Sequence, residues 1–140
     1  MSYLSAALRR LVRERANGAC EYCGTPEGLT FSAHDVDHVV ALKHGGGDDE
    51  DNLALSCTAC NQHKGTDIAS FDSETKTIVP LYNPRRDRWS DHFQVLEHRI
   101  LGRTPTGRAT SRLLQWNRED RLAERTVLSR AGLLRLPEIP

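Results

Sequence analysis

The sequence has no long apolar run, since nowhere in its 140 residues do about 18 apolar side chains follow one another. It also has no charged segment followed by an apolar leader, and these two absences argue against membrane insertion and export. We therefore expect a cytoplasmic protein with no membrane partner. Aromatic residues are scarce, with three Phe, three Tyr and two Trp. A modest hydrophobic core is expected, and a metal cross-link would help to stabilise it.

Net charge is absent too, because 19 Lys and Arg balance 19 Asp and Glu. The charges are nevertheless separated along the chain. Residues 1–18 hold four Arg against one Glu, residues 19–84 hold three Lys against eleven acids, and residues 85–140 hold twelve Arg against seven acids. Basic ends around an acidic centre suit a protein that binds phosphates at its edges and cations in its middle. Solvation of helix faces is the simpler explanation for most single arginines.

No cysteine stands alone. The four form two Cys-x2-Cys pairs, Cys20 with Cys23 and Cys57 with Cys60, separated by 33 residues. In a reducing compartment such pairs are metal ligands more often than disulfides, and four thiolates suit a tetrahedral Zn²⁺ site. We predict a structural zinc ion here, whose binding would supply much of the folding energy. Thiol redox chemistry is the alternative, although it does not explain the presence of two pairs.

Local patterns between the cysteine pairs predict strands and a short helix. Leu29–Phe31 and Val36–Leu42 are short apolar or β-branched segments that we expect to form a hairpin. Residues 43–51 are polar and glycine-rich, as in a loop. Thr58–Lys64 is long enough for about two helical turns. The expected order is strand, strand, helix.

Helices are expected on both sides of this region. Residues 3–16 carry apolar side chains at helical spacing, and Asn17-Gly18 would end that helix. The C-terminal half is expected to hold a short strand and two helices, the second with an Asn cap and a terminating glycine. The strand is predicted at Thr75–Val79, the helices at Thr106–Trp116 and from Asn117 to about Ala131, and the tail from Leu136 is expected to be extended.

Three arginines, Arg85, Arg86 and Arg88, stand next to Trp89. Guanidinium groups match phosphate oxygens, and an aromatic ring can stack on a base. This stretch is therefore the candidate for contact with a nucleic-acid backbone. The alternative is that Trp89 and Phe93 pack in the core while the arginines are solvated.

A polar motif links the two cysteine pairs. Asp37-His38 is followed by glycines at 45–47, by Asn52, and then by the second Cys-x2-Cys, which runs directly into Asn61 and Lys64. Over residues 20–65 this combination resembles the HNH endonuclease family. The resemblance implies a ββα-metal fold that cleaves phosphodiester bonds with a divalent cation. The third signature position, commonly His, is Asn61 here, as in HNN variants of the family.

The resemblance and the chemistry of the side chains suggest individual roles. His38 would be the general base, because an imidazole titrates near neutrality. Asp37 and Asn61 would hold Mg²⁺ or Mn²⁺ through oxygen ligands, Asn52 would bond loop backbone and hold the His38 ring, and Lys64 would reach a phosphate. In a regular strand Asp37 and His38 point to opposite faces, so the strand must end or twist there.

Two further histidines are weaker candidates. His34 precedes Asp37 by three residues and His63 follows Asn61 by two. Either would suit an auxiliary site for a softer ion such as Zn²⁺, Ni²⁺ or Co²⁺. A surface or structural role is the better explanation of both.

Together these observations predict an α+β fold, with a small ββα-metal core stapled by a four-cysteine zinc site. Residues 1–18 would form an N-terminal helix, 19–82 the nuclease core, and 83–140 an arginine-rich helical extension packed on that core. The predicted function is metal-dependent cleavage of nucleic acid, with DNA as the first substrate to consider. The alternative is a non-catalytic zinc module that binds DNA or protein. One centre cuts one strand, so double-strand cleavage would need a homodimer or sequential cuts.

Overall fold

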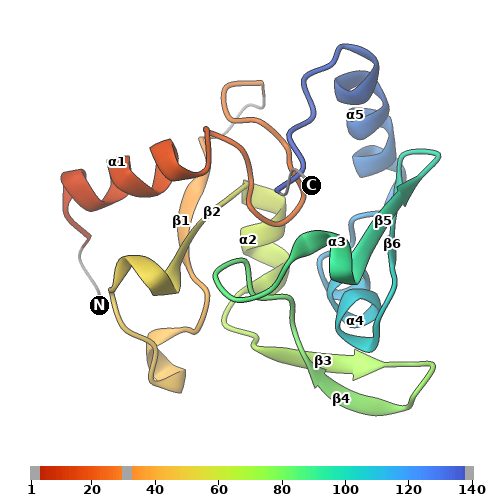
Figure 1. The fold of residues 1–140 in the computed structure, drawn as a ribbon, viewed down its shortest axis with the longest axis horizontal. Coiled ribbons are helices and arrows are strands. Elements are labelled where there is room, and N and C mark those ends of the chain that lie inside the picture. Colours follow the sequence, from red (N-terminus) through yellow and green to blue (C-terminus); the bar gives the residue numbers. More distant parts are fainter. Residues whose placement is uncertain (1–3, 30–32, 138–140) are drawn as a thin grey trace.

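The computed structural model describes residues 4–29 and 33–137, and shows an α+β chain of short elements (Figure 1). In this part of the chain, sheet structure consists of three antiparallel strand pairs. The α+β class predicted from the sequence is confirmed. The elements are α1 (Ala6–Arg15), β1 (Asp35–His38), 3-10 turns at Leu42–His44 and Glu50–Asn52, β2 (Leu53–Ser56), α2 (Thr58–Lys64), β3 (Ala69–Asp72), β4 (Thr77–Pro80), α3 (Trp89–His92), β5 (Phe93–Leu96), β6 (Arg99–Gly102), α4 (Pro105–Leu113) and α5 (Glu119–Arg130).

The N-terminal helix α1 is present as predicted. Ser5 caps it, because its side chain accepts a hydrogen bond from Leu8 N at 3.1 Å. Asn17 and Gly18 both have positive φ and end it. The apolar stripe is narrower than its spacing suggests, since Leu11 is exposed while Val12 is fully buried. A small separate core forms where α1 meets β2, from Leu4, Val12, Leu53 and Leu55.

The central unit is strand, strand, helix, but its strand pairing differs from our expectation. β1 pairs with β2, placing Asp37 opposite Ala54, so β1 has a partner strand that follows the polar loop. Thr30 and Phe31, assigned to the expected hairpin, lie outside the described residues. β2 is buried along its whole length. Burial against α1 on one side and the main core on the other decides this pairing.

The β3–β4 hairpin and α4 are joined by a buried ion pair. The Asp72 carboxylate accepts hydrogen bonds from Arg108 at 2.9 and 3.0 Å, and from Thr75 Oγ1 at 2.6 Å. The Asp72 side chain is inaccessible to solvent and fully paired, which is the condition under which a buried charge is tolerated. The predicted strand at Thr75–Val79 is observed as β4, starting two residues later.

The C-terminal half departs from expectation in three places. β5 and β6 form a hairpin that the sequence did not predict. Its turn has Glu97 and His98 at positive φ, where Asn or Gly would have indicated a turn. α4 ends at Leu113, short of Trp116. Asn117 does not cap α5; its side chain bonds Ile100 N at 3.0 Å and Ile100 O at 2.9 Å. α5 ends as predicted, at Arg130 before Gly132.

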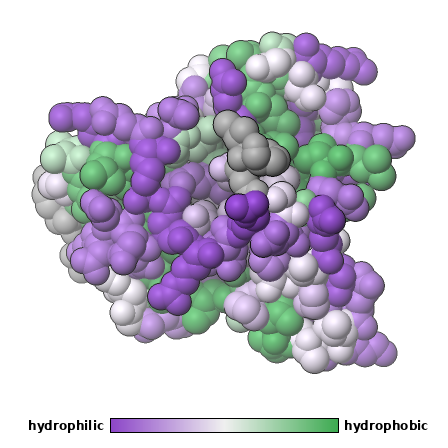
Figure 2. Space-filling view, in the orientation of Figure 1, coloured by the Kyte–Doolittle hydropathy of each residue, from purple (hydrophilic) through white to green (hydrophobic). Residues whose placement is uncertain are grey.

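One main core crosses the boundary predicted between residues 82 and 83. Trp89 and Phe93 are buried in it, so Trp89 packs in the core and is not free to stack on a base. On the face in Figure 2, hydrophilic side chains predominate and hydrophobic surface is divided into separate patches. No helix among the described residues is long and apolar enough to cross a membrane. The core members are Cys20, Tyr22, Cys23, Val39, Ala54, Cys57, Cys60, Tyr82, Trp89, Phe93, Ile100, Leu114 and Trp116.

Candidate active site and metal centre

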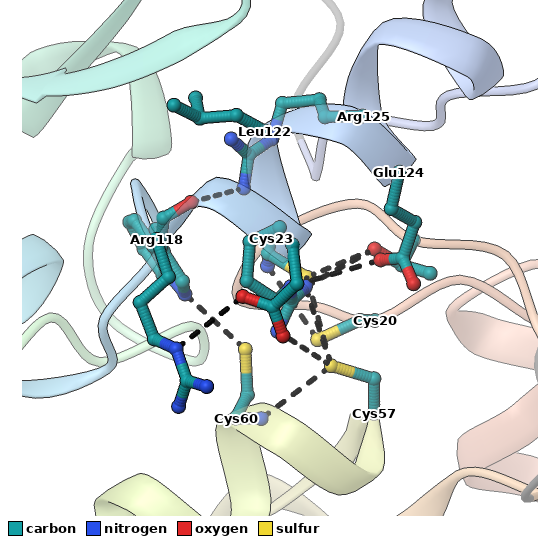
Figure 3. A network of polar contacts seen from close by, with 12 residues as sticks. Cys20, Cys23, Cys57, Cys60, Arg118, Leu122, Glu124 and Arg125 are labelled. Atoms are coloured by element: carbon teal, nitrogen blue, oxygen red, sulfur yellow. Dashed lines mark hydrogen bonds and ion pairs between the residues drawn. The ribbon is translucent and has the colours of Figure 1, made fainter.

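The four cysteines converge as predicted. Their sulfur atoms all lie within 4.8 Å of one another, all four side chains are buried, and none is in a disulfide. Figure 3 shows the sulfurs directed toward one another between the Cys20–Cys23 turn and the start of α2. Three backbone N–H groups donate to sulfur, from Tyr22 and Cys23 to Cys20 Sγ and from Cys60 to Cys57 Sγ. Such bonds stabilise thiolates, so this donor set fits a tetrahedral zinc ion.

Two C-terminal side chains also contact the sulfur cluster. Trp116 Nε1 donates to Cys60 Sγ at 3.2 Å, and Arg121 Nη2 from α5 donates to Cys23 Sγ at 3.1 Å. Arg121 is only 7% exposed. Four thiolates around one Zn²⁺ carry two net negative charges, and a buried guanidinium offsets one of them. Arg121 therefore stabilises the charged form of the cluster.

Replacing Arg121 with methionine is expected to speed zinc loss about tenfold or more, the usual effect of removing an outer partner of a metal site. Transfer of zinc to a chromophoric chelator would measure the rate. Arg130→Met is the matched control, because Arg130 lies on the same helix and is exposed. Equal release rates in the two variants would contradict the role of Arg121.

A second site lies between the end of β1 and α2. Asp37, His38 and Asn61 line one cavity of about 340 Å³, together with Val36, Ala41, Leu42, Lys43, Gly65 and Thr66. β1 ends at His38, which is why neighbouring residues with opposite strand orientations can line the same cavity. α2 follows β2 directly, and this connection brings Asn61 to the cavity.

Asp37 is buried, and two side chains contact its carboxylate. Its Oδ2 accepts a hydrogen bond from the Tyr22 hydroxyl at 2.7 Å, and Lys64 Nζ lies 3.1 Å from the same oxygen. Burial raises the pKa of Asp37, opposed by the charge of Lys64 and the hydrogen bond from Tyr22. Burial, followed by the charge of Asp37, raises the pKa of Tyr22 well above its ordinary value, so the phenol keeps the proton that it donates.

His38 is held from the loop side. Its Nε2 lies 2.8 Å from Asp48 Oδ1. A carboxylate only accepts hydrogen bonds at neutral pH, so Nε2 carries the proton and Nδ1 of the neutral ring keeps a free lone pair. This arrangement is that of a base oriented by a second residue.

Asn52 connects the two ends of the loop that carries Asp48. Its Oδ1 accepts from Val40 N at 3.0 Å, while its Nδ2 donates to Val40 O at 2.9 Å and Gly47 O at 2.8 Å. Gly46 packs so closely here that an added Cβ would overlap the Val40 carbonyl. The amide therefore fixes the backbone between His38 and Asp48.

Substituting Asn52 with aspartate preserves its size but turns the donating nitrogen into an oxygen that faces two carbonyl oxygens. We expect a loss of about 2 kcal/mol in the free energy of unfolding, the usual cost of unsatisfied buried polar groups. Urea titration would measure it. Asp51→Asn, the neighbouring exposed position, is the control, and unchanged stability in Asn52→Asp would refute this assignment.

The divalent cation expected from the sequence would find fewer ready-made ligands in this cavity than zinc would find at the four cysteines. Asn61 Nδ2 lies 3.4 Å from Asp35 Oδ2, which directs the amide nitrogen to Asp35 and leaves its oxygen for a cation. In the described ranges, the four cysteines are the one cluster of three or more Cys, His, Asp or Glu side chains suited to a metal. Asp37 and Asn61 fit a hard cation that keeps several water ligands, as Mg²⁺ does.

The cationic residues predicted to contact nucleic acid are placed unequally. Lys64 is 3% exposed and bonds Asp37 and the His38 carbonyl, so its ammonium lies under the site and not at its surface. Arg85 is paired with Glu21, and burial together with Arg15 lowers its pKa to about 10. Arg86 and Arg88 are exposed. Exposure thus keeps the latter two as candidates for contact with a phosphate.

The two auxiliary histidines, His34 and His63, contact other parts of the protein. His34 is buried, with Nε2 2.8 Å from the Thr25 carbonyl oxygen. His63 Nδ1 lies 3.3 Å from Gln115 Nε2 on the neighbouring chain segment. Neither belongs to a metal-binding cluster in the part of the chain that the structure describes.

Sequence reasoning did not single out Tyr22, Asp48 or Arg121. Asp48 begins an acidic run directly after the glycine loop, and a search for an orienting partner of His38 would have found it. Tyr22 lies between Cys20 and Cys23, and the pattern of this segment indicates metal ligands without indicating a role for the residue between them. Arg121 has no local signal, because only the packing of α5 brings it to the sulfurs.

Fold and site together define a small ββα unit with a buried four-cysteine cluster suited to zinc and a polar cavity built on β1 and α2. Residues 20–67 match the family described as HNH endonuclease, and this segment is an HNH endonuclease domain. The CRISPR-associated endonuclease Cas9 of Corynebacterium diphtheriae is 42% identical over 53 residues, which are 37% of this chain and 5% of that protein. The chain thus spans a small fraction of the curated relative that it matches. No solved structure matches the chain.

Proposed function

We propose that this chain is a metal-dependent endonuclease that hydrolyses phosphodiester bonds in nucleic acid, with DNA as its substrate. The observation that carries the proposal is the cavity shared by Asp37, His38 and Asn61 within the HNH segment. A zinc module that only binds DNA or protein has no need of an oriented imidazole beside a buried carboxylate. We also propose residues 19–82 as the nuclease core and 83–140 as an extension of it.

The residues divide the work of hydrolysis. In the neutral ring, whose tautomer the Asp48 contact fixes, His38 Nδ1 takes a proton from the attacking water. Asp37 and Asn61 would hold Mg²⁺ or Mn²⁺, which when bound supplies Lewis-acid stabilisation of the charge on the phosphate oxygens. Lys64 keeps Asp37 in place from beneath. Zn²⁺ at the four cysteines would hold α2 against the first cysteine turn.

The substrate is proposed to be bound at its backbone by exposed arginines, with Arg86 and Arg88 the candidates. One centre cuts one strand, so nicking is the expected product, and a homodimer or two sequential events would be needed for a double-strand break. We propose a cytoplasmic setting, as expected for a reduced four-cysteine zinc site.

The test is conversion of supercoiled plasmid to the nicked form by the purified, zinc-loaded chain with Mg²⁺ or Mn²⁺. Activity should appear with either cation and disappear with EDTA. Single-stranded DNA and RNA substrates, run in parallel, would decide the polynucleotide class. Binding of DNA without any cleavage under these conditions would favour the non-catalytic zinc module.

A further inference from the structure

We propose that Tyr22, a residue of the first cysteine turn, positions the Asp37 carboxylate and thereby connects the zinc centre to the cavity where the second cation would bind. The inference rests on the proposed function, because Asp37 is assigned to that cation there. It adds a positioning residue that lies outside the polar motif from Asp37 to Lys64.

Tyr22 is fixed at both ends of its backbone. It lies between Cys20 and Cys23; its N–H donates to Cys20 Sγ at 3.4 Å, and its carbonyl accepts from Trp89 Nε1 at 2.9 Å. The side chain is 1% exposed, and its ring meets the Tyr82 ring edge-on with centroids 6.4 Å apart. A displacement of the phenol would therefore require movement of the cysteine turn itself.

The hydroxyl makes the two oxygens of Asp37 unequal. Oδ2 accepts a hydrogen bond from the Tyr22 hydroxyl at 2.7 Å and lies 3.1 Å from Lys64 Nζ, whereas Oδ1 accepts one long hydrogen bond from Lys64, at 3.4 Å. An oxygen that already accepts two short contacts has no lone pair to spare. Tyr22 thus anchors Oδ2, while Oδ1, which accepts only the long bond from Lys64, keeps one lone pair for a hard cation in the cavity.

A phenol is suited to this task because it is a neutral donor. It orients the carboxylate without adding a positive charge that would repel a divalent ion. Lys64 does add such a charge, and the Tyr22 bond lets the carboxylate keep its orientation when that ammonium is drawn toward other acceptors such as the His38 carbonyl, 3.2 Å away.

The experiment compares Mn²⁺ binding to the full zinc-loaded chain and to its Tyr22→Phe variant, by electron paramagnetic resonance of free Mn²⁺. Removing one oxygen keeps the ring and its packing. The Kd for Mn²⁺ is expected to rise about tenfold, with one zinc per chain retained. The Mn²⁺ concentration that gives half-maximal nicking should rise by the same factor.

Two variants separate positioning from folding. Tyr82→Phe removes a hydroxyl from the neighbouring buried ring and should leave the Kd for Mn²⁺ unchanged. Incorporation of 4-aminophenylalanine at position 22 keeps a neutral N–H donor at that place and should restore the Kd to within about twofold of the original. A persistent tenfold loss in this variant would contradict the role of the hydrogen bond.

The failures of the two proposals are distinguishable. If the unmodified chain binds no Mn²⁺ and cleaves nothing, the proposed function falls and the inference falls with it. If the unmodified chain binds Mn²⁺ and Tyr22→Phe binds it equally well, only the inference is overturned. A variant that melts earlier but keeps the Kd would mean that Tyr22 serves stability alone.

Discussion

Replacing His38 with alanine is expected to lower the rate of plasmid nicking by at least ~100-fold, the usual contribution of a general base. The fold should survive, because His38 is the last residue of β1 and its ring bonds Asp48, an exposed residue of the loop. Zinc content and the thermal melting curve should match those of the unmodified chain. The measurement is the initial nicking rate at saturating Mn²⁺.

The matched control is His44→Ala, the same substitution at an exposed histidine that does not line the cavity. It should cleave at the unmodified rate. Imidazole added to His38→Ala should restore part of the activity, because the space vacated by the ring opens into the cavity. Full nicking by purified His38→Ala, in a preparation that shows no cleavage when EDTA is added, would rule out His38 as the base.

The second large effect is expected from loss of the zinc centre. Replacing Cys57 with serine removes one of four ligands, and Cys57 is also the N-cap of α2, whose sulfur accepts from Cys60 N. Structural zinc sites contribute on the order of 10 kcal/mol to folding, which is comparable to the whole stability of a small domain. We expect a largely unfolded chain with no bound zinc.

Circular dichroism and zinc analysis would measure both consequences. Thr58→Ser, one residue along α2, changes a side chain without touching a sulfur and should fold normally. Stripping zinc from the unmodified chain with a strong chelator should reproduce the Cys57→Ser result, and adding zinc back should reverse it. A chain that stays folded and cleaves after complete zinc removal would show that the cluster is dispensable.

The zinc site was predictable because its information is local. Each Cys-x2-Cys pair fixes two ligands within one turn, and the matching pair needs only to be brought opposite. Helix α1 followed from apolar periodicity and from the Asn17-Gly18 stop, and α2 from the length of the segment Thr58–Lys64. The β5–β6 hairpin was not predictable, since Glu97 and His98 adopt positive φ without glycine.

The pairing of β1 with β2 was not predicted, for a related reason. Sequence proximity favoured the segment before Asp35, yet β2 supplies four consecutive buried residues that can pack against both α1 and the main core. Burial of that strand outweighs the shorter connection. Local sequence predicted that Asn117 would cap α5. In the structure its side-chain amide bonds the backbone N–H and carbonyl of Ile100 instead.

The sequence by itself determined the chemistry of this protein: four thiolates, an imidazole, a carboxylate and two amides at spacings that match the HNH endonuclease family. Only the tertiary structure decided how these groups are supported. It buried Lys64 and Arg85 in ion pairs, set Asp48 on His38 and Tyr22 on Asp37, and brought Arg121 to the sulfurs. The physical reason is that the spacing of the ligands along the chain is a local property. The partners of a buried charge depend instead on which distant segment packs against it.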